Sequence, residues 1–273
     1  MDLPALQPRA DAAAVFVSHG SPMLPLEPGS AGPMLAELGR QLLGRGAPRA
    51  VLVFSPHWMT RGGVAVGASQ RPETLYDFQG FDPALRRLRY EVAGDPQLAG
   101  QVFELLRQAG MTAAVDPQRG LDHGAWVPLR MMFPQAEVPV VPLSMPWPLD
   151  AAGAWRLGRA LAPLRRQGVL LLGSGSLTHN LYEFGPDSRL DDPPAPYVLE
   201  FVDWAREAVE RGDAEALLGW RERAPHARRA HPSDEHLLPL HFALGAAGPA
   251  AQPSRFPGGV HYGMLSMDAW VLD

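Results

Sequence analysis

The chain has 273 residues, of which 46% are hydrophobic, and its formal net charge at pH 7 is −5. This length allows one large α/β core, and the acidic balance argues against a nucleic-acid partner or an anionic membrane surface. Cysteine is absent, which excludes a disulfide scaffold, a thiolate nucleophile and a Cys-ligated zinc site. Histidine and carboxylate side chains would therefore have to hold any metal.

The N-terminal segment has no basic stretch followed by an apolar one, so it does not have the pattern of a signal peptide. No window approaches the ~18 continuous apolar residues of a membrane span. We therefore expect a cytoplasmic protein without a membrane partner.

Short apolar runs alternate with helical patterns along the chain. The apolar runs predict strands at 14–18, 50–55, 63–68, 111–115, 138–144, 168–173 and 262–267. Several of these runs are apolar throughout, which is typical of strands buried on both faces of a mostly parallel sheet. The patterns between them predict helices at 96–109 (with Asp95 as N-cap), at 154–161, at 197–211 and from about 235–238 onward, where Pro239 fits the first turn.

This alternation of strands and helices predicts a layered α/β fold, with a mostly parallel central sheet flanked by helices. We expect a single domain over residues 1–273, with its core at about 14–272. The loop at 190–196 is the best candidate for a boundary, but it is too short and too isolated to divide the chain.

Three histidines, His19, His57 and His179, each follow an apolar run within a few residues. In open α/β sheets, ligands bind at the carboxyl ends of the strands, so neighbouring parallel strands would bring these three imidazoles together. Such a group suits zinc, iron, copper or nickel. The spacing contains no local metal motif, however, and an isolated histidine is more often structural, so the residues alone leave both interpretations open.

Two further segments carry histidines in suggestive places. His236 lies at the mouth of the helix expected from 235–238, and His123 lies in a Gly-bounded loop, "GLDHGAWVPL" (120–129). That loop could present an acid/base and an aromatic wall, Trp126, to a substrate; the alternative is an ordered turn whose Trp126 packs in the core. The turn "GSGSL" (173–177) lacks the G-x-S-x-G pattern of a nucleophile elbow. Its small residues are expected to let a substrate or metal approach the backbone.

Five segments occur in the order "FVSHGSPM" (16–23), "SPHWMTRG" (55–62), "GLDHGAWVPL" (120–129), "GSGSLTHNL" (173–181) and "PSDEHLLPL" (232–240). Together they resemble the class III extradiol ring-cleavage dioxygenases, most of all the 4,5-DOPA dioxygenase branch. The resemblance implies one divalent metal ion at the carboxyl ends of the strands, Fe(II) for activity, with Zn(II) often found in the same place. It also implies two small-molecule partners, a catechol substrate and O2.

The resemblance extends to individual residues of the site. His19, His57 and His236 match metal ligands, and the adjacent Glu235 leaves a one-residue ambiguity at the third position, where related enzymes have glutamate. His179 matches either a fourth ligand of a zinc form or a catalytic acid/base, and His123 matches a second acid/base. We expect Ser21 and Trp126 to contact the substrate.

The function implied by the resemblance is cleavage of a catechol ring by a monomer or homodimer. Two alternatives stay open. The first is a zinc-dependent hydrolase on the same scaffold, which would need a carboxylate base, either Glu235 or Asp122. The second is a non-catalytic binding protein similar to the Memo-type relatives of this superfamily.

Overall fold

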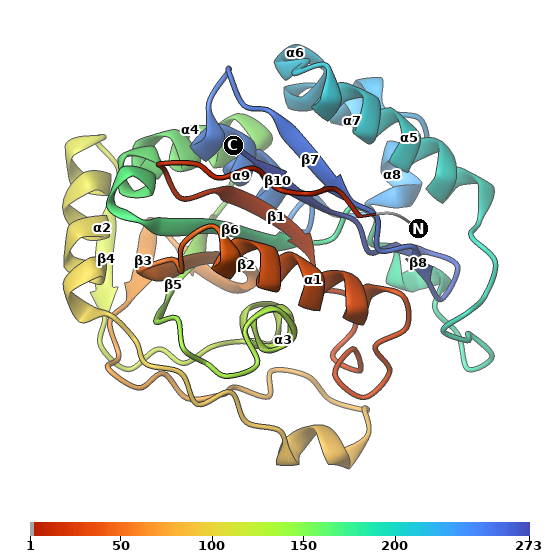
Figure 1. The fold of residues 1–273 in the computed structure, drawn as a ribbon. Coiled ribbons are helices and arrows are strands. Elements are labelled where there is room, and N and C mark those ends of the chain that lie inside the picture. Colours follow the sequence, from red (N-terminus) through yellow and green to blue (C-terminus); the bar gives the residue numbers. More distant parts are fainter. Residues whose placement is uncertain (1–2) are drawn as a thin grey trace.

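A computed structural model describes residues 3–273, and Figure 1 shows one twisted sheet with helices on both faces. The sheet order is β4-β3-β5-β2-β6-β1-β10-β7. Its strands are β1 (Ala14–Ser18), β2 (Ala50–Arg61), β3 (Val64–Gly67), β4 (Ala113–Asp116), β5 (Val140–Trp147), β6 (Val169–Gly175), β7 (Pro253–Phe256) and β10 (Ala269–Leu272). The central strands β5, β2, β6 and β1 run parallel, which confirms the predicted single-domain α/β fold with a mostly parallel sheet.

The helices form two layers. On one face lie α1 (Ala31–Gly44) and α3 (His123–Met132) (Figure 1). The other layer contains α2 (Pro96–Gln108), α4 (Ala151–Leu161), α5 (Pro196–Glu210), α6 (Ala214–Leu218), α7 (Trp220–Arg223), α8 (Ala227–Ala230) and α9 (Leu238–Ala247). The described residues also contain three 3-10 turns: η1 (Pro83–Arg87), η2 (Ala162–Gln167) and η3 (Leu181–Glu183). Within residues 3–273, no helix combines the length and the apolar character needed to cross a bilayer.

Alternate residues of the central strands face the two layers. On β1, Phe16 belongs to the core beneath α9, whereas Val15 and Val17 belong to the core beneath α1 and α3. Because both faces are covered, every residue of β1 and β6 is buried. This explains why these strands are apolar runs without polar alternation.

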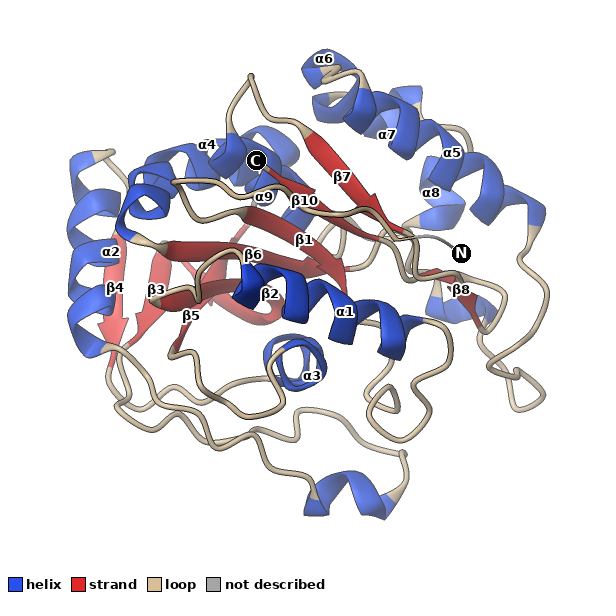
Figure 2. Cartoon of the chain, in the orientation of Figure 1, coloured by secondary structure: helices blue, strands red, loops and turns tan. Residues whose placement is uncertain are grey.

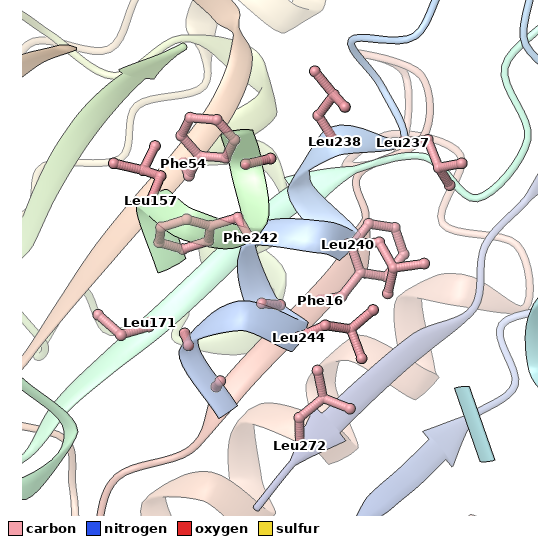
Figure 3. Packing of buried hydrophobic residues seen from close by; sticks show 14 of the residues in the cluster. Phe16, Phe54, Leu157, Leu171, Leu237, Leu238, Leu240, Phe242, Leu244 and Leu272 are labelled. Atoms are coloured by element: carbon pink, nitrogen blue, oxygen red, sulfur yellow. The ribbon is translucent and has the colours of Figure 1, made fainter. Parts of the chain in front are cut away.

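Helix α9 packs directly on the sheet and on α4. Figure 3 shows its apolar side chains among those of β1, β2, β6 and α4, and the rings of Phe54 and Phe242 stack with centroids 4.9 Å apart. Gly158 of α4 lies against the backbone of Phe242, where a Cβ atom would overlap the carbonyl. The glycine that weakens the helical pattern at 154–161 is therefore a point of close helix contact.

The predicted helices are confirmed, but some strand predictions are wrong. Asp95 caps α2 by accepting a hydrogen bond from the backbone N–H of Leu98 (2.8 Å). The strand predicted at 262–267 is instead a small hairpin of β8 (Val260–His261) and β9 (Leu265–Ser266), outside the main sheet. Strands β10 and β7 form one edge of the main sheet and pair antiparallel. The sequence patterns predicted neither these two strands nor helix α1. Helix α1 does have apolar residues at helical spacing, Leu35, Leu38 and Leu42, which sequence reasoning missed, whereas β7 and β10 are placed by tertiary pairing.

Candidate metal centre

Three imidazole nitrogens converge at the carboxyl ends of the central strands. Nε2 of His57 lies 3.2 Å from Nε2 of His19 and 3.3 Å from Nε2 of His236. These three residues form one of the groups in the described chain whose donor atoms all lie within 4.8 Å of one another. They come from three segments that are separated by up to 217 positions in the sequence, so only the fold brings them together.

The strand order explains the convergence of His19 and His57. Strand β6 lies between β1 and β2, and His19 directly follows β1. His57 lies inside β2, because this strand does not end at residue 55 as predicted but continues to Arg61. The register of β2 against β5 shifts between Phe54 and Met59, and His57 sits in this irregular stretch. A bulge of this kind redirects a side chain next to a site.

His236 reaches the same point through the close approach of its segment to β6. The segment of His236 and the first turn of α9 lie on Gly175 and Gly173, where a Cβ atom would overlap the carbonyl oxygens of His236 and Pro239 respectively. The backbone N–H of Ser176 also donates to the carbonyl of His236 (2.8 Å). The small residues of this turn were expected to make room for a substrate or metal. That expectation is corrected: they make room for the backbone that carries His236.

The second ring nitrogens of two of these histidines have partners that orient the rings. Nδ1 of His19 lies 3.2 Å from the hydroxyl oxygen of Ser174, which itself donates to the carbonyl of Gly124, so the Nδ1–H of His19 is the donor to Ser174. Nδ1 of His236 lies 3.0 Å from a carboxylate oxygen of Glu235. Both contacts leave Nε2 with a free lone pair that points at the centre, the arrangement that metal-ligating histidines use.

The electrostatic environment keeps the three imidazoles neutral. Burial lowers the pKa of His19 and of His236 well below the usual value, and the neighbouring histidines lower it further. Burial and the nearby His123 lower the pKa of His57 to about 3. Neutral imidazoles are the form that binds metal ions. The Nε2 separations are close to the edge of about 3.4 Å expected for a tetrahedron with Zn–N bonds of ~2.1 Å. The residues therefore fit a divalent metal ion.

His179 lies beside this triad. Its ring stacks on that of His236, with centroids 3.5 Å apart and planes at 7°. The possible metal-donor atoms of His179 group with those of Glu235 and His236, and His179 does not belong to the group formed by His19, His57 and His236. Burial lowers the pKa of His179 to about 4, so its imidazole is neutral at pH 7.

His123 lies on the other side of the triad, with its ring centroid 3.9 Å from that of His57. It is the first residue of helix α3 rather than part of a loop, and Asp122 is the N-cap that accepts from the backbone N–H of Ala125 (3.2 Å). Asp77 accepts two hydrogen bonds from His123, one from the backbone N–H and one from Nδ1, both 2.9 Å. Burial alone would raise the pKa of Asp77, but the bonds and charge of His123 lower it.

The two residues expected to contact the substrate, Ser21 and Trp126, lie in different environments. Ser21 lies two positions after His19, is half-buried, and accepts a hydrogen bond from the backbone N–H of Met23 (3.2 Å). Trp126 is completely buried, and its indole N–H donates to the carbonyl of Leu75 (2.9 Å). The expectation that Trp126 forms a wall of the substrate site is therefore corrected: it packs in the core on the α1 and α3 side of the sheet.

Sequence reasoning missed Asp77 and Ser174 as partners of the site. Asp77 lies in "TLYDFQG" (74–80), a loop segment with no motif, and only its flanking aromatic residues distinguish it. Ser174 was considered only as a nucleophile. Both residues act on a histidine that is distant in the sequence, so no local pattern could have indicated them.

The chain is similar to known proteins in both sequence and structure. Residues 13–270 match the family described as the catalytic LigB subunit of aromatic ring-opening dioxygenase. The chain is 40% identical over 234 residues to 4,5-DOPA dioxygenase extradiol of Beta vulgaris, covering 85% of this chain and 86% of that protein. It is 36% identical over 259 residues to 4,5-DOPA dioxygenase extradiol of Escherichia coli (strain K12), covering 93% and 92%. The crystal structure of an uncharacterized protein from Escherichia coli K12 superimposes with a TM-score of 0.75 at 28% identity, covering 96% of this chain and 100% of that one.

Proposed function

This chain belongs to the family of ring-cleaving dioxygenases represented by the catalytic LigB subunit, and we propose that it opens a catechol ring beside its two hydroxyl groups with O2, at one Fe(II) ion held by His19, His57 and His236. The observation that carries this proposal is the convergence of three neutral imidazole Nε2 atoms at separations of 3.2 and 3.3 Å. Relatives named 4,5-DOPA dioxygenase extradiol make a 4,5-DOPA-like catechol the substrate to test first.

In this reaction the chain's own residues would hold the metal, orient its ligands and move protons. His19, His57 and His236 hold the metal, with Ser174 and Glu235 orienting two of the rings. When bound, divalent iron would supply coordination of both catechol oxygens and electron transfer to O2.

His179 and His123 flank the triad, and we propose that they move protons. One takes the proton of a catechol hydroxyl on binding, and the other returns a proton during ring opening. Both rings contact a ligand of the triad, at centroid distances of 3.5 Å to His236 and 3.9 Å to His57, so each is next to the place where the hydroxyl groups would lie.

The hydrolase alternative has less support. Asp122, one candidate base, is 1% exposed, and its carboxylate accepts hydrogen bonds from Ser55 (2.7 Å) and from Arg119 (3.3 Å). Glu235, the other candidate, is engaged by His236 and by the hydroxyl of Ser233 (2.9 Å). A base for water activation needs a free oxygen that faces the metal. Both carboxylate oxygens of Asp122 are engaged, and Glu235 uses its Oε1 to orient the ring of His236.

Anaerobic reconstitution tests the proposal. Metal-free protein is loaded with Fe(II), mixed with L-DOPA and then with O2, and O2 uptake is compared with the formation of a yellow ring-opened semialdehyde. We expect one O2 consumed for each ring opened, and no product from protein loaded with Zn(II). Ester hydrolysis that continues without O2, or uptake of O2 without a ring-opened product, would contradict the proposal.

A further inference from the structure

Asp77 accepts two hydrogen bonds from His123, and the proposed function above assigns Asp77 no role. Oδ1 of Asp77 accepts the backbone N–H of His123, and Oδ2 accepts the ring Nδ1, each at 2.9 Å. The first bond satisfies one of the free N–H groups at the start of helix α3. The second engages one of the two ring nitrogens, which leaves Nε2 as the nitrogen available to a substrate. The carboxylate therefore determines both the position and the protonation pattern of this imidazole.

The fold holds Asp77 opposite His123 through a short ladder. The backbone N–H of Leu75 donates to the carbonyl of Leu121, and the N–H of Leu121 donates to the carbonyl of Glu73, both at 2.8 Å. These two bonds form a parallel bridge between Thr74 and Leu121, and Asp77 and His123 follow it by three and two residues, so the bridge brings the two residues close together. Figure 2 shows the loop between β3 and α2 passing below α3.

Further bonds anchor the same loop. The indole of Trp126 donates to the carbonyl of Leu75 (2.9 Å), and the hydroxyl of Tyr76 donates to the carbonyl of Leu88 (2.6 Å). The segment carrying Asp77 is thus anchored at the two residues that precede it. A group held in this way can select one tautomer of its partner, as a loosely held surface carboxylate cannot.

We infer that Asp77 is a positioning residue that holds His123 in the Nδ1–H tautomer, so that Nε2 carries the lone pair that takes the proton of a catechol hydroxyl. In that step the hydroxyl O–H bond breaks, an Nε2–H bond forms, and the carboxylate of Asp77 stabilises the resulting imidazolium. The inference rests on the proposed function for the identity of the proton donor. The tautomer itself is independent of that function.

The substitution Asp77→Asn separates positioning from structure. The side-chain oxygen of asparagine can still accept the backbone N–H of His123, and Asn caps helix termini about as well as Asp. Its NH2 group then faces Nδ1, which must become an acceptor, so the proton moves to Nε2 and the base is lost. Asp82→Asn is the matched control: Asp82 lies in the same loop and caps η1 by accepting from Ala84 (2.7 Å), without contact to a histidine.

The tautomer is read by nitrogen-15 NMR on the Zn(II)-loaded protein, with the His123 signals assigned by their loss in His123→Gln. We expect a protonated Nδ1 in the wild type and in Asp82→Asn, and a protonated Nε2 in Asp77→Asn. With Fe(II) and L-DOPA, Asp77→Asn should lose kcat by ~10²–10⁴-fold. Its KM, metal content and thermal unfolding should stay close to those of Asp82→Asn.

The outcomes are distinguishable. A wild-type His123 protonated at Nε2, or the same tautomer in wild type and Asp77→Asn, overturns the inference. A changed tautomer with unchanged kcat overturns its catalytic half. If the wild-type protein opens no catechol ring, the proposed function fails, whereas the NMR measurement still decides whether Asp77 selects the tautomer.

Discussion

Nδ1 of His19 lies 3.2 Å from the hydroxyl oxygen of Ser174, on the neighbouring strand β6. Ser174 donates its own proton to Gly124 at the start of α3, so one buried hydroxyl links β1, β6 and α3 at the candidate metal centre. Removing it should loosen the His19 ring without removing a ligand. We expect Ser174→Ala to weaken metal binding by about 10- to 100-fold, measured by competition with a chelator.

The matched control for this change is Ser176→Ala. Ser176 lies on the same turn and is equally buried, but its hydroxyl donates to the carbonyl of Thr178 (2.8 Å) rather than orienting a histidine. Equal metal affinities of the two variants would show that Ser174 does not orient His19.

The three converging histidines should each be needed for the metal. We expect His19→Ala, His57→Ala and His236→Ala each to bind far less than one ion per chain, because two imidazoles leave the coordination shell incomplete. Metal content after reconstitution, measured by mass spectrometry, checks this. His226→Ala is the control, since His226 is exposed, pairs with Glu200 (2.9 Å) and belongs to none of the metal-donor groups of the described residues. Full metal content in His19→Ala would remove His19 from the ligand set.

His179 is proposed as a proton carrier, and His179→Gln tests it. Glutamine can still donate and accept hydrogen bonds, but it cannot carry a proton at neutral pH. We expect the variant to bind Fe(II) and catechol and to lose turnover by ~10²–10⁴-fold. Single-turnover mixing with O2 and a separate metal titration give the two readouts. A loss of metal in parallel with activity would instead make His179 a fourth ligand.

The close contact between β6 and α9 predicts a cost for a single methyl group. Gly173→Ala would place a Cβ atom on the carbonyl of Pro239. We expect the free energy of unfolding to fall by about 1–3 kcal/mol from overpacking, and metal affinity to fall with it because His236 lies on the displaced segment. Gly185→Ala, which has nothing within 4 Å of the added atom, should be neutral in urea unfolding and in metal binding. An equally stable Gly173→Ala would contradict the packing.

A buried histidine outside the metal centre should make stability depend on pH. His231 is completely buried, donates from Nε2 to the carbonyl of Leu177 (2.8 Å), and has its pKa lowered by burial to about 3. The unfolded chain takes up this proton near the ordinary pKa of ~6.5, so the unfolded state binds more protons below that pH. Stability from neutral His231 is therefore complete above ~6.5 and is lost as the pH falls toward the folded-state pKa.

The substitution His231→Gln keeps a donor for the carbonyl of Leu177 but removes the titration. Urea unfolding at pH 7 and pH 5 should show a smaller loss of stability in this variant than in the wild type, by up to ~1.4 kcal/mol per pH unit. His226→Gln, at an exposed position, should follow the wild type. If both variants lose the same stability as the wild type, His231 does not account for the pH dependence.

Local patterns in the sequence determined much of the fold. The apolar runs predicted β1 and β6 almost to the residue, because strands covered on both faces carry no polar alternation. Asp95 and Pro96 marked the start of α2, because capping depends only on residues within one turn. The placement of His19, His57 and His179 after apolar runs likewise indicated a site at one edge of the sheet.

Only the tertiary structure decided how these pieces meet. The bulge that turns His57 inward depends on the pairing of β2 with β5, and the tautomer assigned to His123 depends on Asp77, which is 46 positions away. The sequence left two positions open for Trp126, beside the substrate or in the core. Its buried position, with the indole N–H bonded to the carbonyl of Leu75, is in the core. Periodicity and capping are set by neighbours in the chain, so the sequence displays them directly. Strand order, close backbone contact and hydrogen bonds between distant residues depend on the whole packed chain, so they have no local signature.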